Sequence, residues 1–519
     1  MRLNRQSPFA SLTRRQMVWS AAATVAGGLI AGPAAARAGF PKRGGRIRVA
    51  SVASSTADTL DPAKGALSTD YVRHYMFYSG LTQFDANLVP QLALADSIES
   101  ADQALWTIKL KHGVAFHNGK VLTAKDVAFS LMRQKNPETA SKAKPLADQF
   151  QGVRVVSPHE LQLQLTGPNA DLPSILATSH FLIIADDTAT FDSANGTGPY
   201  KCKLFRPGVR TVGVRNENYW KPGHPYLDEI ELIGIPDEVS RVNALLSGDV
   251  QLINAVNPRS IRRIQASATN TVFETKSGLY TDIIMQHREL PTSNPDFVLA
   301  MKYLLDRDLI RRALFRDYGL VGNDQPIPPF NRYFLADLPQ RPYDPERAKF
   351  LLKRAGLLGV RLPMYASPAA EGSVDMASVL QESAANIGLR LAVNRVPSDG
   401  YWSNHWMKHP LTFGNTNPRP TADLIFSLFY KSDAPWNESG WKDAHFDQLL
   451  LEARAEVDEA KRKRIYSDMQ VLVHEKCGVG IPVFISLIDA HDLRLKGYGG
   501  IPIGGLMGYS FSEYVWWDG

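Results

Sequence analysis

The sequence predicts an α/β protein with two or three domains. Its 519 residues are enough for two or three well-filled cores. Strand-like and helix-like patterns alternate along the chain, which is typical of α/β folds. The composition is that of a globular protein, with 44% hydrophobic and 21% charged residues.

The first strand and the first helix follow from the spacing of side chains. Residues 45–51 alternate between apolar and polar side chains, as a strand does. Residues 69–80 are predicted to be helical, because Tyr71, Tyr75 and Tyr78 follow the i, i+4, i+7 spacing of one helix face.

Further elements are predicted in the same way. Residues 106–119 alternate as a strand and end in a turn. Thr123 then stands where it can cap a helix that has Asp126 in its first turn, where a negative charge is favourable. Two long helical stretches are expected at residues 371–387 and 446–473, the second with a charged, solvated face.

The N-terminal residues 1–38 carry five arginines and no acid, so the net charge of +6 is mostly theirs. Without them 53 basic residues face 52 acidic ones, a balance that gives no reason to expect a nucleic-acid partner. Ser11–Val18 resembles a twin-arginine signal, and Ala36–Ala38 is a small-x-small cleavage site. The sequence thus predicts a periplasmic protein that is exported by a twin-arginine signal and begins at Gly39.

Patterns of catalytic or metal-binding residues are not apparent in the sequence. There is no GxSxG elbow, and the best histidine pair for a metal, His405 and His409, is followed by Pro410. We therefore expect no enzyme activity, no cofactor and no metal, although a secreted hydrolase stays open because catalytic residues can be distant in sequence. The sequence also leaves open whether Cys202 and Cys477 are free or bridged.

Several motifs resemble, in the same order, those of the peptide/dipeptide-type solute-binding proteins (family 5, cluster C) that serve ABC importers. They are spread over roughly residues 43–515. The motifs are Trp106–Gly119, Leu122–Ser130, Gly196–Tyr200, Arg215–Glu229, Pro236–Val250, Ala300–Arg307, Tyr343–Gly356 and Ile481–Phe484. One such motif is a weak signal, whereas the ordered set is specific.

The resemblance implies a two-lobed periplasmic binding protein fold of type II, with an extra subdomain on lobe I. Residues 39–75, 196–280 and 485–519 would form lobe I, residues 76–195 the extra subdomain and residues 281–484 lobe II. It further implies a ligand engulfed between closing lobes, no catalysed reaction, a monomer, and delivery to ABC permease subunits in the inner membrane. Presentation of the ligand to a membrane sensor is an alternative that the sequence does not separate from import.

The stretch Gly400–Trp441 contains four of the nine tryptophans, interspersed with polar residues. Aromatic bodies with a few polar groups on loops suit a small-molecule pocket, while the alternative is that the tryptophans pack a core. The candidate ligand contacts in this stretch are Tyr401, Trp402, Asn404, Asn417, Arg419 and Trp436.

Arg419 is the most informative of these candidates. Peptide-binding members of the family place an aspartate for the ligand's α-amino group in this loop, where the present chain has Asn417, Pro418 and Arg419. An arginine favours a carboxylate, phosphate or sugar-acid group, so amino-acid conjugates such as opines are as plausible as short peptides. Alternatively, Arg419 pairs with a local acid such as Asp423.

The remaining candidates come from other parts of the chain. Thr69 and Tyr71 belong to the first helix of lobe I, and Arg288 follows the strand that enters lobe II. Asn323 and Asp324 follow a helix, where Asp324 could receive an ammonium group; both could equally be turn residues.

Overall fold

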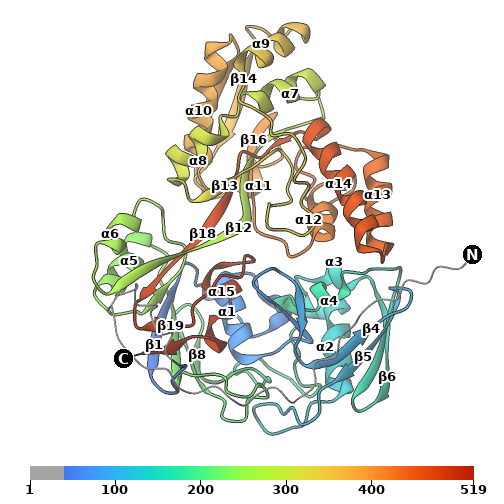
Figure 1. The fold of residues 1–519 in the computed structure, drawn as a ribbon, viewed down its shortest axis with the longest axis vertical. Helices are drawn as coiled ribbons and strands as arrows, with labels where there is room; N and C mark the ends of the chain where they lie inside the picture. Colours follow the sequence, from blue (N-terminus) through green and yellow to red (C-terminus); the bar gives the residue numbers. More distant parts are fainter. Residues whose placement is uncertain (1–39, 519) are drawn as a thin grey trace, which may run out of the picture. The chain divides into compact units, whose positions relative to one another are not determined.

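A 12-stranded sheet is the framework of the protein, which we describe from a computed structural model (Figure 1). The structure describes residues 40–518, and the predicted signal segment with its cleavage site lies outside them. In the middle of the sheet, β12 (Asn270–Met285) and β18 (Val483–Asp492) pair antiparallel and run between the upper and lower parts of Figure 1.

The sheet continues on both sides of this central pair. On one side lie β16 (Leu411–Thr416), β14 (Arg361–Ala366) and β15 (Arg390–Arg395). On the other side lie β11 (Leu252–Ile253), β1 (Arg46–Ser51), β10 (Glu229–Gly234), β9 (Arg210–Arg215) and β8 (Tyr200–Arg206). Two short strands, β13 (Gly319–Val321) and β17 (Val479–Gly480), pair with β18 and β12.

The long strand β12 changes its surroundings along its length. Its register against β18 shifts between Thr275 and Leu279. Beyond that shift, residues 279–285 are all buried, because β12 now also pairs with β16 and is covered by helices. The shift thus lies just before the residues of β12 that pair with β16.

The upper part of Figure 1 holds two hydrophobic clusters. One contains side chains of β14, β15 and β16 and of the helices α7 (Pro295–Tyr303), α8 (Arg307–Phe315), α9 (Pro345–Arg354) and α10 (Ser373–Asn386). The other contains side chains of α12 (Ala422–Phe429), α13 (Ala444–Ala455) and α14 (Glu459–Lys476). A short helix, α11 (Tyr401–Asn404), precedes β16.

The single long helix predicted at residues 446–473 is wrong. The chain forms α13 and α14 instead, separated by an extended turn at Glu456. The break has a local cause, because Asp458 caps α14 by accepting a hydrogen bond of 3.0 Å from the backbone N–H of Lys461.

The lower part contains helices packed on the sheet and a second, separate sheet. α1 (Ser68–Phe77), α5 (Glu238–Leu246), α6 (Ile261–Gln265) and α15 (Gly505–Gly508) lie with the strands β1 and β8–β11. The four-stranded antiparallel sheet comprises β4 (Ala95–Glu99), β5 (Leu105–Leu110), β7 (Glu160–Leu165) and β6 (Phe150–Ser157), with the helices α2 (Ala124–Met132), α3 (Lys144–Ala147) and α4 (Leu172–Ile175). It has its own apolar core, so it is an additional subdomain.

Local predictions in the lower part are confirmed. The carboxylate of Asp126 accepts hydrogen bonds from the backbone N–H of Thr123 at 2.9 Å and from its hydroxyl at 2.8 Å, which fixes the start of α2.

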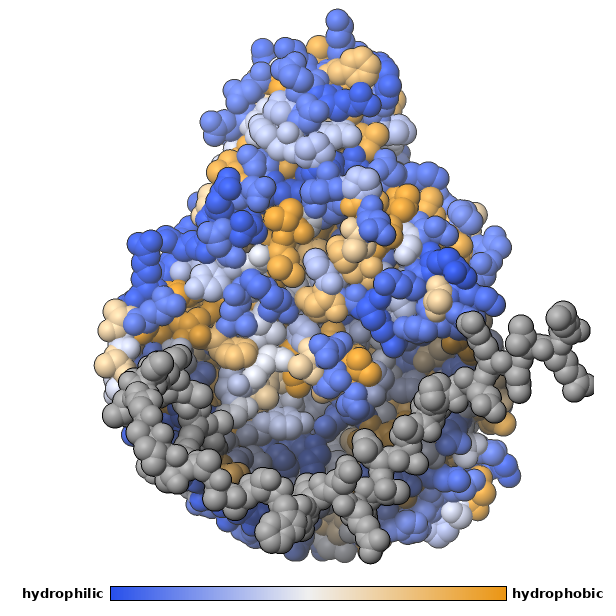
Figure 2. Space-filling model, viewed as in Figure 1, coloured by the Kyte–Doolittle hydropathy of each residue, from blue (hydrophilic) through white to orange (hydrophobic). Residues whose placement is uncertain are grey.

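Cys202 and Cys477 are both free thiols. None of the helices within residues 40–518 combines the length and apolar character that a membrane crossing needs. Figure 2 shows a mainly hydrophilic face, with orange hydrophobic groups also in its middle.

Candidate ligand-binding site

Arg419 lies in the loop between β16 and α12, at the point where the two parts of the fold meet. The last residue of β16, Thr416, pairs with Tyr280 of β12, just beyond the register shift of that strand. The loop ends where the hydroxyl of Thr421 caps α12 by accepting the N–H of Leu424 at 3.1 Å. The hydrogen-bonded strand and the helix cap therefore fix both ends of the loop that carries Arg419.

The guanidinium of Arg419 has no carboxylate partner among residues 40–518. Its Nε is buried without a hydrogen bond, and its Nη1 makes only a long contact of 3.5 Å with the carbonyl oxygen of Pro418. It lies over two rings, 5.6 Å from the centre of Phe429 and 6.0 Å from that of Trp436. Burial lowers the pKa of Arg419 from its ordinary value, but a guanidinium remains charged at neutral pH.

The alternative that Arg419 pairs with Asp423 is wrong. The carboxylate of Asp423 is bound by Arg454, at 3.0 Å from Nε and 3.3 Å from Nη2. Leaving the Nε of Arg419 buried without a partner costs free energy, so this half-buried guanidinium would be stabilised by a bound anion.

Aromatic side chains of the lower part stand near Arg419. The rings of Tyr509 and His180 lie 5.2 Å and 5.6 Å from that of Tyr71 in α1. Burial raises the pKa of Tyr71 and of Tyr509, and in both cases the positive charge of Arg419 acts against this rise. Burial lowers the pKa of His180, and Arg419 lowers it further, which keeps that imidazole neutral. Arg419 thus acts electrostatically on all three rings.

A small cavity of about 10 Å³ beside Arg419 is lined by both parts of the fold. This is about the room that one water molecule needs. Its lining is mainly apolar: Leu88, Gly278, Pro326, Ile327, Pro328, Phe330, Asn331, Pro418, Arg419, Thr421, Ile425 and Pro502. Leu88 and Pro502 come from the lower part and the others from residues 278–425, so the cavity lies between the two parts.

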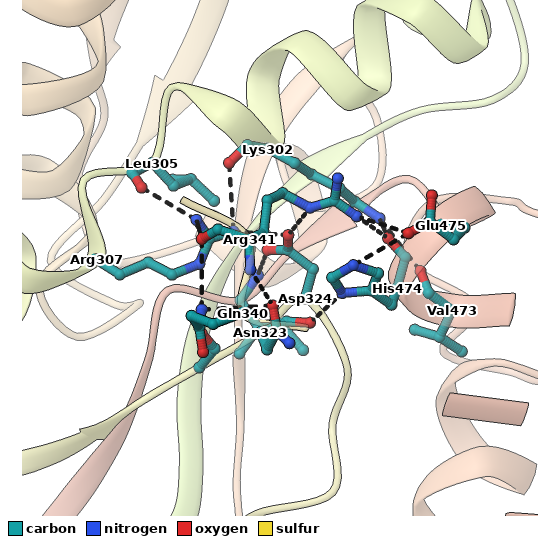
Figure 3. A network of polar contacts seen from close by, with 12 residues as sticks. Lys302, Leu305, Arg307, Asn323, Asp324, Gln340, Arg341, Val473, His474 and Glu475 are labelled. Carbon is teal, nitrogen blue, oxygen red and sulfur yellow. Dashed lines mark hydrogen bonds and ion pairs between the residues drawn. The ribbon is translucent and has the colours of Figure 1, made fainter. Parts of the chain in front are cut away.

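Asp324 does not lie free to receive a ligand's ammonium group, as the sequence suggested. It is fully buried, and its Oδ2 binds Arg307 at 2.6 Å and Arg341 at 2.9 Å, while Oδ1 accepts the N–H of Ile481 at 3.1 Å (Figure 3). Although burial acts to raise it, the charges of Arg307, Lys302 and Arg341 hold the pKa of Asp324 below its usual value. That prediction is therefore corrected, because two guanidinium groups already neutralise this carboxylate.

Asn323 has a similar structural role. Its side-chain oxygen accepts the N–H of Arg341 at 2.9 Å, and its amide nitrogen donates to the carbonyl of Pro339 at 3.0 Å. Asn323 and Asp324 thus anchor the segment that continues into the Pro326–Asn331 wall of the cavity. They support the cavity from behind rather than lining it.

Thr69 and Tyr401 are buried and their hydroxyls are already used. The hydroxyl of Thr69 donates to the carbonyl of Ala53 at 2.6 Å. The hydroxyl of Tyr401 donates to the carbonyl of Phe413 at 2.7 Å and accepts the N–H of the same residue at 3.1 Å. Both predicted ligand contacts are corrected to structural side chains, because both residues are fully buried and their hydroxyls bind the backbone.

Trp402, Asn404 and Arg288 are exposed but lie away from Arg419. Trp402 and Asn404 belong to α11, before β16, whereas Arg419 follows that strand. A six-residue strand is about 20 Å long. Arg288 follows β12 at the same distant end, since Met285 pairs with Leu411. The Gly400–Trp441 stretch therefore does not form one surface. Of its candidate ligand contacts, only Asn417 and Trp436 lie beside Arg419.

Sequence reasoning missed Tyr509, His180 and Phe429. Tyr509 directly follows α15 and has a left-handed backbone conformation, with φ of 74°. His180 lies in the additional subdomain, and Phe429 ends α12. No periodic pattern or motif in the sequence identifies these three residues, because only the tertiary fold brings their segments to Arg419.

Two buried carboxyl groups lie behind the Arg419 loop, on the face of β12 and β16 that carries Tyr280 and Thr416. Asp282 pairs in register with Gly414, where a Cβ would come within 2.6 Å of the Asp282 Oδ1 and closer still to the Glu438 Oε1. The absence of a side chain at Gly414 therefore makes room for both carboxyl groups. Burial raises the pKa of Asp282 to about 7 and also raises that of Glu438.

Residues 40–518 contain no group of three or more His, Cys, Asp or Glu side chains arranged to hold a metal ion. His405 and His409 do lie together, with 3.1 Å between Nδ1 of the first and Nε2 of the second. Their rings stack with Tyr365, so this pair is part of an aromatic cluster.

Comparisons with known proteins agree with the two-part architecture. The chain is 24% identical over 467 residues to the glutathione-binding protein GsiB of Pectobacterium atrosepticum, which covers 86% of this chain and 90% of the relative. The structure resembles the periplasmic binding protein DppA from Helicobacter pylori in complex with the peptide STSA (TM-score 0.76, 22% identity, 91% of this chain and 98% of that one). It equally resembles AgaA in complex with agropinic acid from A.tumefacien R10 (TM-score 0.76, 22% identity, 92% and 99%).

These likenesses confirm the predicted periplasmic binding protein fold with an additional antiparallel subdomain. A family model described as bacterial extracellular solute-binding proteins, family 5, middle, matches residues 87–438, more than half of the chain. The family is non-catalytic, which removes the hydrolase alternative. The chain therefore belongs to the family 5 extracellular solute-binding proteins of bacteria, as the ordered motifs predicted.

Proposed function

We propose that this protein is the periplasmic binding component of an ABC importer for a peptide-like or amino-acid-derived solute that carries a negative group. The observation that carries the proposal is Arg419, a half-buried cation without a carboxylate partner in the described chain, whose Nε is buried without a hydrogen bond beside a cavity between the two parts. The peptide and the acid bound by DppA and AgaA support this ligand class.

The proposed mechanism is capture by closure. Residues 39–75, 196–280 and 485–519 form lobe I, residues 76–195 the extra subdomain and residues 281–484 lobe II. The ligand's carboxylate approaches Arg419 from lobe II, and closure brings the rings of Tyr71 and Tyr509 from lobe I against it. Excluding water strengthens each polar contact inside the site. The monomer then delivers its ligand to permease subunits in the inner membrane.

The side chains around Arg419 have separate roles in this proposal. Phe429 and Trp436 lie under the guanidinium and restrict it by cation–π contact. The rings of Tyr71 and Tyr509 lie 5.2 Å apart and within the field of Arg419, so their hydroxyls serve as donors to the same anion. Asn417, exposed beside Arg419, supplies a polar contact at the rim. Export follows the twin-arginine signal predicted in residues 1–38.

Arg419→Gln is expected to weaken binding of a carboxylate ligand by about 1.5–3 kcal/mol, or roughly 10- to 150-fold, the scale of a charge-assisted hydrogen bond. Native mass spectrometry of the purified protein first identifies retained ligands. Calorimetry then compares each peptide found with its C-terminal amide. Wild type should prefer the acid, and Arg419→Gln should bind acid and amide equally.

Arg347→Gln is the matched control, since this exposed arginine also lies over a phenylalanine ring, 5.6 Å from the centre of Phe350, but does not line the cavity. It should leave affinity unchanged. Equal affinity of wild type for acid and amide would contradict an anion site at Arg419. Retained molecules that the protein converts to products would contradict the binding function itself.

A further inference from the structure

A second contact between the two parts of the fold lies outside the cavity. The start of α4 in the additional subdomain meets α14 of the upper part at Asp171 and Arg462. The Nη2 of Arg462 lies 2.8 Å from the Oδ1 of Asp171, and the two side chains are only 4% and 1% exposed. An ion pair buried to this extent joins segments nearly 300 positions apart in the sequence.

Each partner is held in place before the pair forms. The backbone N–H of Asp171 donates to the side chain of Asn169 at 2.9 Å, and its carbonyl accepts the N–H groups of Ser174 and Ile175. Arg462 lies between two rings, 5.4 Å from the centre of Tyr333 and 5.5 Å from that of Tyr466. The backbone at Asp171 and the side chain of Arg462 therefore need little new ordering when the two residues meet, which reduces the entropic cost of the contact.

The same surface is connected to the Arg419 loop. The backbone N–H of Ala170 donates to the carbonyl of Arg454 at 3.1 Å. The guanidinium of Arg454 in turn binds Asp423 in the first turn of α12, four residues after Arg419. The contact between the two parts thus extends through one arginine to the helix that follows the ligand loop.

We propose that Asp171 and Arg462 form a closure latch: each charge can be buried in the closed state only while its partner is present, so the pair controls closing and thereby ligand affinity without touching the ligand. This inference rests on the proposed capture by closure. In an open state both side chains are solvated, so burial of the pair occurs only on closing. Desolvation then offsets most of the attraction, and the intact pair contributes little net free energy.

Removing one partner has an asymmetric effect. Asp171→Asn leaves Arg462 buried without a counter-ion in the closed state, but leaves it in water in the open state. The whole penalty therefore falls on closing, and the stability of each part is little affected. The affinity for a ligand scales with the fraction of protein in the binding-competent state, so it falls with the closed population.

Small-angle X-ray scattering of the ligand-free mature protein, paired with urea unfolding, tests the latch. Asp171→Asn should shift the closed-to-open ratio at least tenfold towards open, visible as a larger radius of gyration, with an unchanged urea midpoint. The double variant Asp171→Leu/Arg462→Met should restore the wild-type radius, because it leaves no buried charge. Asp148→Asn, which breaks the exposed Lys144–Asp148 pair in the same subdomain, is the control and should change neither quantity.

Identical radii of wild type and Asp171→Asn would overturn the latch, as would a lowered urea midpoint without any change in radius. If Asp171→Asn does not fold, the double variant decides: a wild-type radius supports the latch, and an expanded one contradicts it. Scattering of the ligand-free protein does not depend on the ligand's charge. A result that contradicts the latch would therefore not affect the proposed anion site at Arg419. A result that contradicts the anion site would likewise not affect the proposed latch.

Discussion

Asp324→Asn is expected to lower the free energy of unfolding by about 3–5 kcal/mol, the cost of breaking a buried ion pair by removing one partner. Arg307 and Arg341 bind this carboxylate from both sides and are themselves buried. Asparagine keeps the size of the side chain but removes its charge, so Arg307 loses its counter-ion and Arg341 keeps only the half-exposed Glu475. Urea unfolding at neutral pH measures the change.

Glu475→Gln is the control for this prediction. The carboxylate of Glu475 also approaches Arg341, at 3.3 Å, but its side chain is 49% exposed. An exposed ion pair contributes roughly 0–1 kcal/mol, so this variant should unfold nearly as wild type does. If the free energy of unfolding fell equally in the two variants, burial of the Asp324 ion pairs would not increase their contribution to stability. Because Asp324 anchors the segment that lines the cavity, its loss should also weaken ligand binding.

The fold was predictable because its signals are local. The strand at residues 46–51, the helix from Ser68 and the Thr123–Asp126 cap all depend on neighbouring residues. The break between α13 and α14 was not predictable from periodicity alone, since apolar spacing continues across it. There Asp458 caps a new helix, so the chain does not form one continuous helix.

The candidate site was only partly predictable, because burial and pairing depend on distant residues. Asp324 looked like a free acid in sequence, yet its partners Arg307 and Arg341 stand 17 positions away on either side. Tyr401 looked like a pocket wall, but its hydroxyl serves the backbone of Phe413. Arg419 was recognisable because it stands where a resembling family has an acid. Which rings surround it depends on the tertiary fold.

Asp282→Asn is expected to stabilise the protein at pH 8 and to have little effect near pH 4. The ordinary aspartate pKa is about 3.9, and burial raises the pKa of Asp282 to about 7 in the folded state. Below pH 4 the carboxyl is protonated in both states. Between pH 4 and pH 7 only the unfolded chain ionises, so the folded state loses up to roughly 4 kcal/mol relative to it. Above pH 7 both states are ionised and the loss is constant.

The variant removes this loss because asparagine is a neutral isostere of protonated aspartic acid. The groups near Asp282 contain no cation that would compensate the charge: Glu438, Tyr280, Tyr401, Tyr430 and Cys477 are neutral or acidic. Thermal unfolding of wild type and variant between pH 4 and pH 8 should give curves that diverge as the pH rises. Asp337→Asn, an exposed substitution of the same kind, should follow wild type throughout.

The difference between wild type and variant isolates Asp282 from other buried acids. Burial also raises the pKa of Asp489, to about 6, and this residue destabilises the folded state with the same sign as pH rises. Because Asp489 is unchanged in the variant, its contribution cancels in the comparison. Parallel curves for wild type and Asp282→Asn would mean that Asp282 ionises normally in the folded protein. Divergent curves would show that burial keeps Asp282 neutral in the folded protein, next to Glu438 and to the strand β16 that leads to Arg419.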